Sequence, residues 1–164
     1  MIHRFEPYAD HLMFMISEPD GSDDMFDGDD YDSPDESWRL AAGRGLIAVQ
    51  TARFDHVLVT LTIRETPPPD TPFDGFDHVV EADILLPHGR LVVYGDWRPE
   101  DAEPITVAPG RYRVRVAYAP TDQRPAKYDE DGPGDHLEYQ LTLWPAPAES
   151  GVRVLKQGGS PWAY

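Results

Sequence analysis

The chain has 164 residues and a formal net charge of −16 at pH 7, from 30 acidic and 14 basic side chains. This excess disfavours DNA, RNA and anionic membrane surfaces as ligands, because each would approach through a repulsive field, and it favours basic partners. The absence of Cys excludes disulfides and zinc–thiolate sites and fits a reducing compartment. No apolar run has the length of a signal peptide or a membrane span, so we expect a cytoplasmic protein without membrane insertion.

Apolar residues alternate with a period of two along most of the chain, between turns rich in Gly and Pro. Short strands at this spacing are typical of a two-layer antiparallel β-sandwich. We therefore expect an all-β fold of about nine strands, with one domain over residues 1–157 and a tail over 158–164. The predicted strands are 12–16, 46–50, 57–63, 79–86, 91–94, 105–107, 111–118, 137–144 and 152–155.

One short helix is predicted near residues 34–42. Ser33 and Glu36 have the spacing of a capping box, and Pro34 stands at the first helical position. The helix is expected to pass through Trp38 and to end before Gly43.

A strongly acidic stretch lies between the first and second predicted strands. Residues 18–36 carry ten carboxylates and no Lys or Arg, and Met25, Phe26 and Tyr31 alternate with the acids. A basic protein with a groove for nucleic acid can accept such a segment, with carboxylates in place of phosphates and rings in place of bases. The alternative is that Phe26 and Tyr31 fold back onto the sheet and anchor a long loop.

The long connections are expected to lie together. If successive strands run antiparallel, connections alternate between the two ends of the sandwich, so 17–45, 64–78, 95–104 and 119–136 share one end. These four hold 23 of the 30 acidic residues, whereas 52–55, 87–89, 108–110 and 145–151 are shorter and belong to the other end. Long loops on a rigid scaffold commonly form binding surfaces, although acidic loops can also serve solubility alone. The candidate partner-binding residues are Asp23, Asp24, Met25, Phe26, Asp27, Asp29, Asp30, Tyr31, Asp32, Asp129, Glu130 and Asp131.

We expect no cofactor, with calcium as the possible exception because the carboxylates are clustered. The EF-hand spacing fails, because the sixth position counted from Asp20 is Met25 and the twelfth is Tyr31. Ligands drawn from several loops leave a calcium site open as an alternative. His78 with Glu81, and His136 with Glu138, are local candidates for a transition metal, but two ligands do not make a site.

No pattern of an enzyme is present. The sequence has no Gly-x-Ser-x-Gly, no Cys nucleophile and no phosphate-binding Gly-rich loop. A row of Arg111, Arg113 and Arg115 along one strand is expected to form cross-strand ion pairs on a solvated face. Its expected partners are Glu81, Asp83 and Glu138.

The order of several short patterns resembles that of a known family. The chain reads His11-Leu-Met-Phe14, then Trp38, Gly45-Leu-Ile-Ala-Val-Gln-Thr51, a Val79-Val80 strand, Leu85-Leu-Pro87 and Pro109-Gly-Arg-Tyr112. Over about residues 8 to 118 this order resembles the competence protein J family, which includes an inhibitor of a DNA-entry nuclease. The acidic stretch and the ending from Leu137 to Tyr164 depart from the family, so no interface residue is carried over.

The resemblance implies a non-enzymatic inhibitor, and the charge argument points the same way. We therefore expect an inhibitor or immunity-type protein that blocks a basic enzyme, such as a nuclease or toxin, through its acidic loops. One alternative is a calcium-dependent binding module of the β-sandwich type. Another is a β-sandwich with no loop-based activity.

Overall fold

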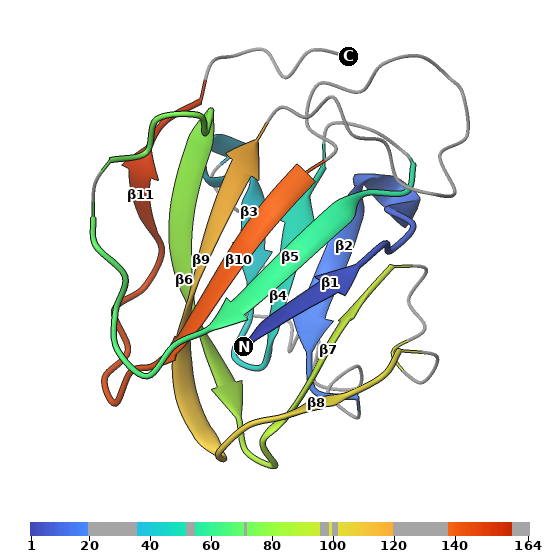
Figure 1. Ribbon diagram of the computed structural model, residues 1–164, viewed down its shortest axis with the longest axis vertical. Helices are drawn as coiled ribbons and strands as arrows, with labels where there is room; N and C mark the ends of the chain where they lie inside the picture. The colour runs from blue at the N-terminus through green and yellow to red at the C-terminus, as the bar shows by residue number, and fades with distance from the viewer. Residues whose placement is uncertain are drawn as a thin grey trace.

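In the computed structural model, the described residues are 1–19, 36–51, 55–70, 72–95, 99, 102–119 and 138–158. They form two sheets that face each other (Figure 1). The all-β sandwich expected from the alternating pattern is confirmed. Among the described residues, no helix is long and apolar enough to cross a membrane.

The first sheet has six strands and the second has five. In order across the first sheet these are β1 (Ile2–Phe5), β5 (Leu58–Ile63), β10 (Glu138–Pro145), β9 (Gly110–Ala119), β6 (His78–Leu86) and β11 (Arg153–Lys156). Across the second sheet they are β3 (Leu40–Ala42), β4 (Leu46–Gln50), β2 (Met13–Ser17), β7 (Arg90–Tyr94) and β8 (Ile105–Thr106). Two 3₁₀ turns, η1 (Asp10–Leu12) and η3 (Glu36–Trp38), precede β2 and β3.

Each of the nine predicted strands overlaps an observed one, and the pattern missed β1 and β3. The helix expected near 34–42 is wrong beyond Trp38, where the chain forms β3 instead. Arg39 has a φ of 57°, which turns the backbone out of any helical path. Its carbonyl then accepts a hydrogen bond from the Gln50 amide, and Leu40 enters the core at 3% exposure.

The core between the sheets is built from the inward-facing side chain of every second residue. At its centre lie three aromatic rings from both sheets. Tyr139 contacts Phe14 and Tyr118 edge to face, with ring centroids 5.3 and 5.2 Å apart. Such pairs add roughly 0.5–1.5 kcal/mol each beyond the burial of their area.

Two tight connections define one end of the sandwich, which we call the turn end. Residues 87–89 join β6 to β7, and residues 107–109 join β8 to β9. The two meet where the Val107 amide donates to the Gly89 carbonyl at 2.7 Å. Gly89 has a φ of 66°, and a Cβ there would lie 2.1 Å from the Val107 oxygen, so the position needs glycine. We call the opposite end, where β7 and β9 finish and β10 begins, the loop end.

The expectation that the four long connections share one end is wrong. β2 and β3 both run antiparallel to β4, so residues 18–39 connect the turn end to the loop end. β5 runs parallel to β10 and therefore in the same direction as β6, so residues 64–77 also pass from one end to the other, along the β6 side of the sheet (Figure 1). The strands flanking 95–104 and 119–137 do place both at the loop end, and the connection after β4 joins them there. Two features changed which connections lie at which end: the unpredicted β3, and the crossover of residues 64–77 from one end of the sandwich to the other.

Candidate binding surface at the loop end

β1 forms an edge of the first sheet and pairs only with β5 among the described strands. The Ile63 amide donates to the Met1 carbonyl, and the register places His3 opposite Leu61 and Phe5 opposite Val59. In an antiparallel pair, residues that bond to the partner alternate with residues that do not. The backbone N–H and C=O groups of Ile2 and Arg4 therefore point away from β5, to the open side of the sheet.

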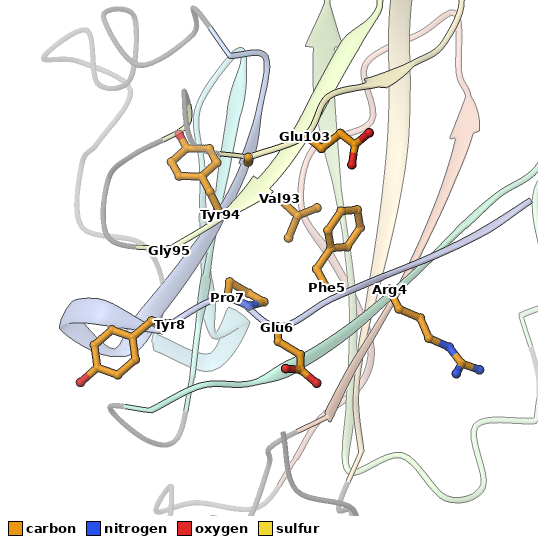
Figure 2. Close-up of a pocket in the computed structure, with 10 residues that line it drawn as sticks. Arg4, Phe5, Glu6, Pro7, Tyr8, Val93, Tyr94, Gly95 and Glu103 are labelled. Carbon is orange, nitrogen blue, oxygen red and sulfur yellow. The ribbon is translucent and has the colours of Figure 1, made fainter. Parts of the chain in front are cut away.

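A hollow of about 440 Å³ lies between β1 and the end of β7. Figure 2 shows the Phe5 ring beside Val93 in the middle of this hollow, whereas the Arg4 guanidinium points away. Glu103, which precedes β8, adds a carboxylate. The lining residues are Arg4, Phe5, Glu6, Pro7, Tyr8, Val93, Tyr94, Gly95, Ala102 and Glu103.

The chain after β1 is fixed against the end of β7 by a close backbone contact. A Cβ on Gly95 would lie 1.7 Å from the Tyr8 carbonyl oxygen, so only glycine allows the two segments to meet. The Pro7 carbonyl accepts from the Val57 amide at 3.0 Å, and the Ala9 amide donates to the Asp55 carbonyl at 2.8 Å. One side of the hollow is thus held in place by backbone bonds.

A second hollow, of about 550 Å³, lies on the other side of β1, over the beginnings of β5 and β10. It shares Arg4, Phe5 and Glu6 with the first, so these residues form a ridge between the two. Glu138 lines the second hollow as Glu103 lines the first. The described charges around the ridge are three carboxylates and one guanidinium, which favours a cationic ligand.

The twelve candidate residues from the sequence lie outside the described residues. Their role stays a prediction. The residues missed by the sequence analysis are Arg4, Glu6 and Glu103. The available signal was the Ile2-His3-Arg4-Phe5-Glu6 alternation before Pro7, which is too short to distinguish a strand from an irregular terminus.

Glu18, the first carboxylate of the acidic stretch, lies at the turn end rather than at an acidic functional end. Its side chain is 7% exposed and accepts hydrogen bonds from the His88 and Arg90 amides at 2.9 and 3.1 Å. Its other oxygen lies 3.1 Å from His88 Nδ1. Glu18 therefore satisfies the backbone of the turn between β6 and β7.

The arginine row forms the expected ion pairs with Glu81 and Asp83, but its solvated face is a wrong prediction. Arg113 and Arg115 are 6% and 8% exposed, and both contact Glu81. Segment 64–77 covers this face, because Arg115 also donates to the Pro69 carbonyl and to Asp70. Glu138 lies elsewhere and accepts from Gln140, whereas Arg111 contacts Glu149 at 3.9 Å.

The candidate metal ligands have other partners. Nε2 of the buried His78 lies 3.0 Å from the Trp38 carbonyl, and Nδ1 accepts from the Gly158 amide. Glu81 is engaged by two arginines, and His136 lies outside the described residues. Over the described parts of the chain, no three His, Cys, Asp or Glu side chains are grouped to hold a metal ion.

No protein-family model matches the sequence, and no curated protein matches it. Two solved structures share its fold. One, "Crocagin biosynthetic gene J", is 23% identical, covers 88% of this chain and 97% of its own, and has a TM-score of 0.58. The other is ComJ from Bacillus subtilis, the inhibitor of the DNA degrading activity of NucA, with 12% identity, 89% and 99% coverage and a TM-score of 0.61. The resemblance to the competence protein J family is confirmed at the level of the fold.

Proposed function

We propose that this chain is a non-enzymatic binding protein that inhibits a basic enzyme, and that a nuclease is its first candidate target. The observation that carries the proposal is the net charge of −16 on a fold shared with a nuclease inhibitor. Arg113 and Arg115 are neutralised inside the protein and form no basic patch. With these two cations engaged internally, the excess of acidic side chains favours a basic partner.

The fold supports this proposal without naming the target. ComJ inhibits the DNA degrading activity of NucA, and its structure aligns with 89% of this chain. The crocagin protein is named after a biosynthetic gene, and that name specifies no activity. A binding role is therefore better supported than catalysis.

The physical mechanism is competition for a cationic cleft. A nuclease holds its substrate by cations placed to meet phosphates, and carboxylates at similar spacing compete with DNA for them. The acidic residues proposed to take part are those at 23–32 and 129–131, together with the carboxylates around β1. Steering by opposite charge raises the association rate at low salt and fades as salt screens it.

The test is inhibition of DNA degradation by basic nucleases encoded in the same genome, with NucA as a reference and an acidic nuclease as control. Increasing amounts of the protein are added at low and at high salt. We expect stoichiometric inhibition of one basic nuclease, with an inhibition constant that weakens steeply as salt rises. Failure to inhibit any basic nuclease, or inhibition that is indifferent to salt, would contradict the proposal.

A further inference from the structure

We propose that the open edge of β1 binds an extended, basic segment of the partner as an added strand. The segment would lie beside β1, in the hollow between β1 and β7. The identity of the partner rests on the proposed function, whereas the binding mode rests on the geometry of β1 alone. Three features of the described residues support it.

The first feature is the free backbone of β1. Ile2 and Arg4 direct their N–H and C=O groups away from β5, and no described residue pairs with them. Such groups are a template for another strand, because main-chain hydrogen bonds give affinity without requiring a particular sequence. The hollow of about 440 Å³ lies on this side of β1 and leaves space for the added segment.

The second feature is the contrast between β1 and the other edges. β11, at the opposite edge of the same sheet, carries exposed Arg153 and Lys156 and an irregular register between Val154 and Lys156, which are devices that discourage pairing. β3 and β8, at the edges of the second sheet, have three and two residues. β1 has four residues in regular register. Its first residue, Ile2, and the preceding Met1 are the exposed large hydrophobic residues of the described chain, at 63% and 84%.

The third feature is charge. Glu6 and Glu103 line the hollow on the open side of β1, against Arg4 alone. In a strand, successive side chains point to opposite faces, so an added segment would direct every second side chain toward these carboxylates. Lys or Arg at those positions, alternating with apolar residues, is the sequence that complements the site.

The sharpest variant is Arg4→Pro, compared with Arg4→Ala. Arg4 directs its N–H to the open side, so proline removes that donor without breaking a β1–β5 hydrogen bond. Both variants remove the same charge, and a melting temperature near that of the parent shows that each folds. We expect Arg4→Pro to lose about tenfold in affinity relative to Arg4→Ala, the equivalent of one hydrogen bond. Equal affinities of the two variants would overturn the added strand.

The probes are the nuclease found by the inhibition assay and a synthetic peptide, Lys-Val-Arg-Val-Lys-Val-Arg with blocked ends. The peptide is titrated against the labelled protein, and backbone amide shifts are followed by NMR. We expect shifts in β1 and around the hollow, and none with the peptide in which Glu replaces Lys and Arg. Shifts confined to other surfaces, or equal response to the acidic peptide, would overturn the proposal.

The two probes separate the two proposals. An inhibited nuclease whose affinity is unchanged by Arg4→Pro leaves the proposed function and removes the binding mode. Peptide binding at β1 without any inhibited nuclease supports the binding mode and contradicts the proposed function. A dimer that depends on protein concentration, and that Arg4→Pro abolishes, would show that a second copy of this chain occupies the edge of β1. That result would overturn the proposal that a basic segment of a partner binds there.

The electrostatic part of the proposal is tested by a matched pair of variants. Glu103→Gln removes a carboxylate beside β1, and Glu149→Gln removes an exposed one at the turn end. We expect Glu103→Gln to weaken binding of the basic peptide several-fold and to reduce its dependence on salt, and Glu149→Gln to leave both unchanged. Equal effects of the two substitutions would mean that net charge, and not this site, attracts the peptide.

Discussion

Each sheet has a buried group of side chains on its outward face, and the two groups are of opposite kinds. On the first sheet, the outward residues of β6 and β9 are charged and form a network of Glu81, Asp83, Arg113 and Arg115. On the second sheet, the outward residues form an apolar cluster that is 0–4% exposed. The cluster consists of Met15, Leu46, Ala48, Val92 and Tyr94.

The charged residues on the first sheet hold neighbouring segments in defined positions through directional contacts, which the apolar cluster cannot provide. Arg115 donates to the Pro69 carbonyl, and its guanidinium carbon lies 5.2 Å from the Phe73 ring, so it holds segment 64–77 in one position. Asp83 accepts from the Ser150 and Gly151 amides at 2.9 and 2.6 Å and fixes the connection before β11. Apolar contacts stabilise without direction, whereas buried ion pairs stabilise little overall but penalise any misplaced partner.

The largest effect is expected from Glu81→Ala on the charged face. The change leaves two buried guanidinium groups without the carboxylate that they share. Removing one partner from a buried pair costs about 3–5 kcal/mol of unfolding free energy, measured by urea denaturation. Glu149→Ala breaks an exposed pair and should change it by less than about 1 kcal/mol. A small loss for Glu81→Ala would show that this face is hydrated.

Met15→Ala tests the apolar face. Met15 is fully buried in the outward cluster of the second sheet, and truncating a buried Met costs about 2–5 kcal/mol. The loss should be the same at low and high salt, because no charge is changed. The double variant with Glu81→Ala should be additive within about 0.5 kcal/mol, since the two sites share no partner. Strong coupling would mean that the faces are not independent.

Glu18→Gln tests the junction where the chain passes between the sheets. One oxygen of the Glu18 carboxylate accepts both backbone amides of the turn after β6, and a glutamine keeps that oxygen but loses the negative charge that strengthens the two bonds. We expect a loss of about 1–2 kcal/mol. His88→Ala keeps the backbone donors and removes a side chain that is 77% exposed, so its cost should stay below about 0.5 kcal/mol. The reverse order of the two costs would assign the stability to the His88 ring.

The alternating patterns were sufficient for the fold class because each long strand has one face in the core. β9 has the clearest alternation, and the predicted strand at 111–118 lies within the observed Gly110–Ala119. β3 has three residues, and its Leu40-Ala-Ala42 has no polar alternation to mark a strand. The direction of β5 relative to β6 depends on contacts distant in sequence, so the crossover at 64–77 was not predictable from local pattern.

The candidate site was predictable only in its charge. The pairing of Arg113 with Asp83 followed from the strand pattern, but the burial of both depended on the crossover. The hollows depend on where β1 meets β7, and Gly95 gives no hint in the sequence that Tyr8 approaches it. The net charge can be counted from the sequence without knowing the fold. The edge strand of a sheet and its neighbours can be identified only when the order of the strands is known.

Tyr118→Phe gives the smallest expected effect. It changes a residue in the core between the two sheets, so its cost can be compared with the costs of the variants on the outward faces. Tyr118 is fully buried, which raises the pKa of its hydroxyl well above the usual value of 10.0. The folded state therefore resists ionisation, and this contribution to stability is complete below about pH 10 and is lost as pH rises above it. The Tyr118 hydroxyl donates a hydrogen bond to the Arg39 carbonyl. Phenylalanine removes this bond and should cost about 1 kcal/mol at neutral pH, because the carbonyl keeps its second bond, from the Gln50 amide. It should also make the alkaline fall in stability shallower, as measured by urea denaturation between about pH 8 and 11. An alkaline fall identical to that of the parent would mean that other groups govern it.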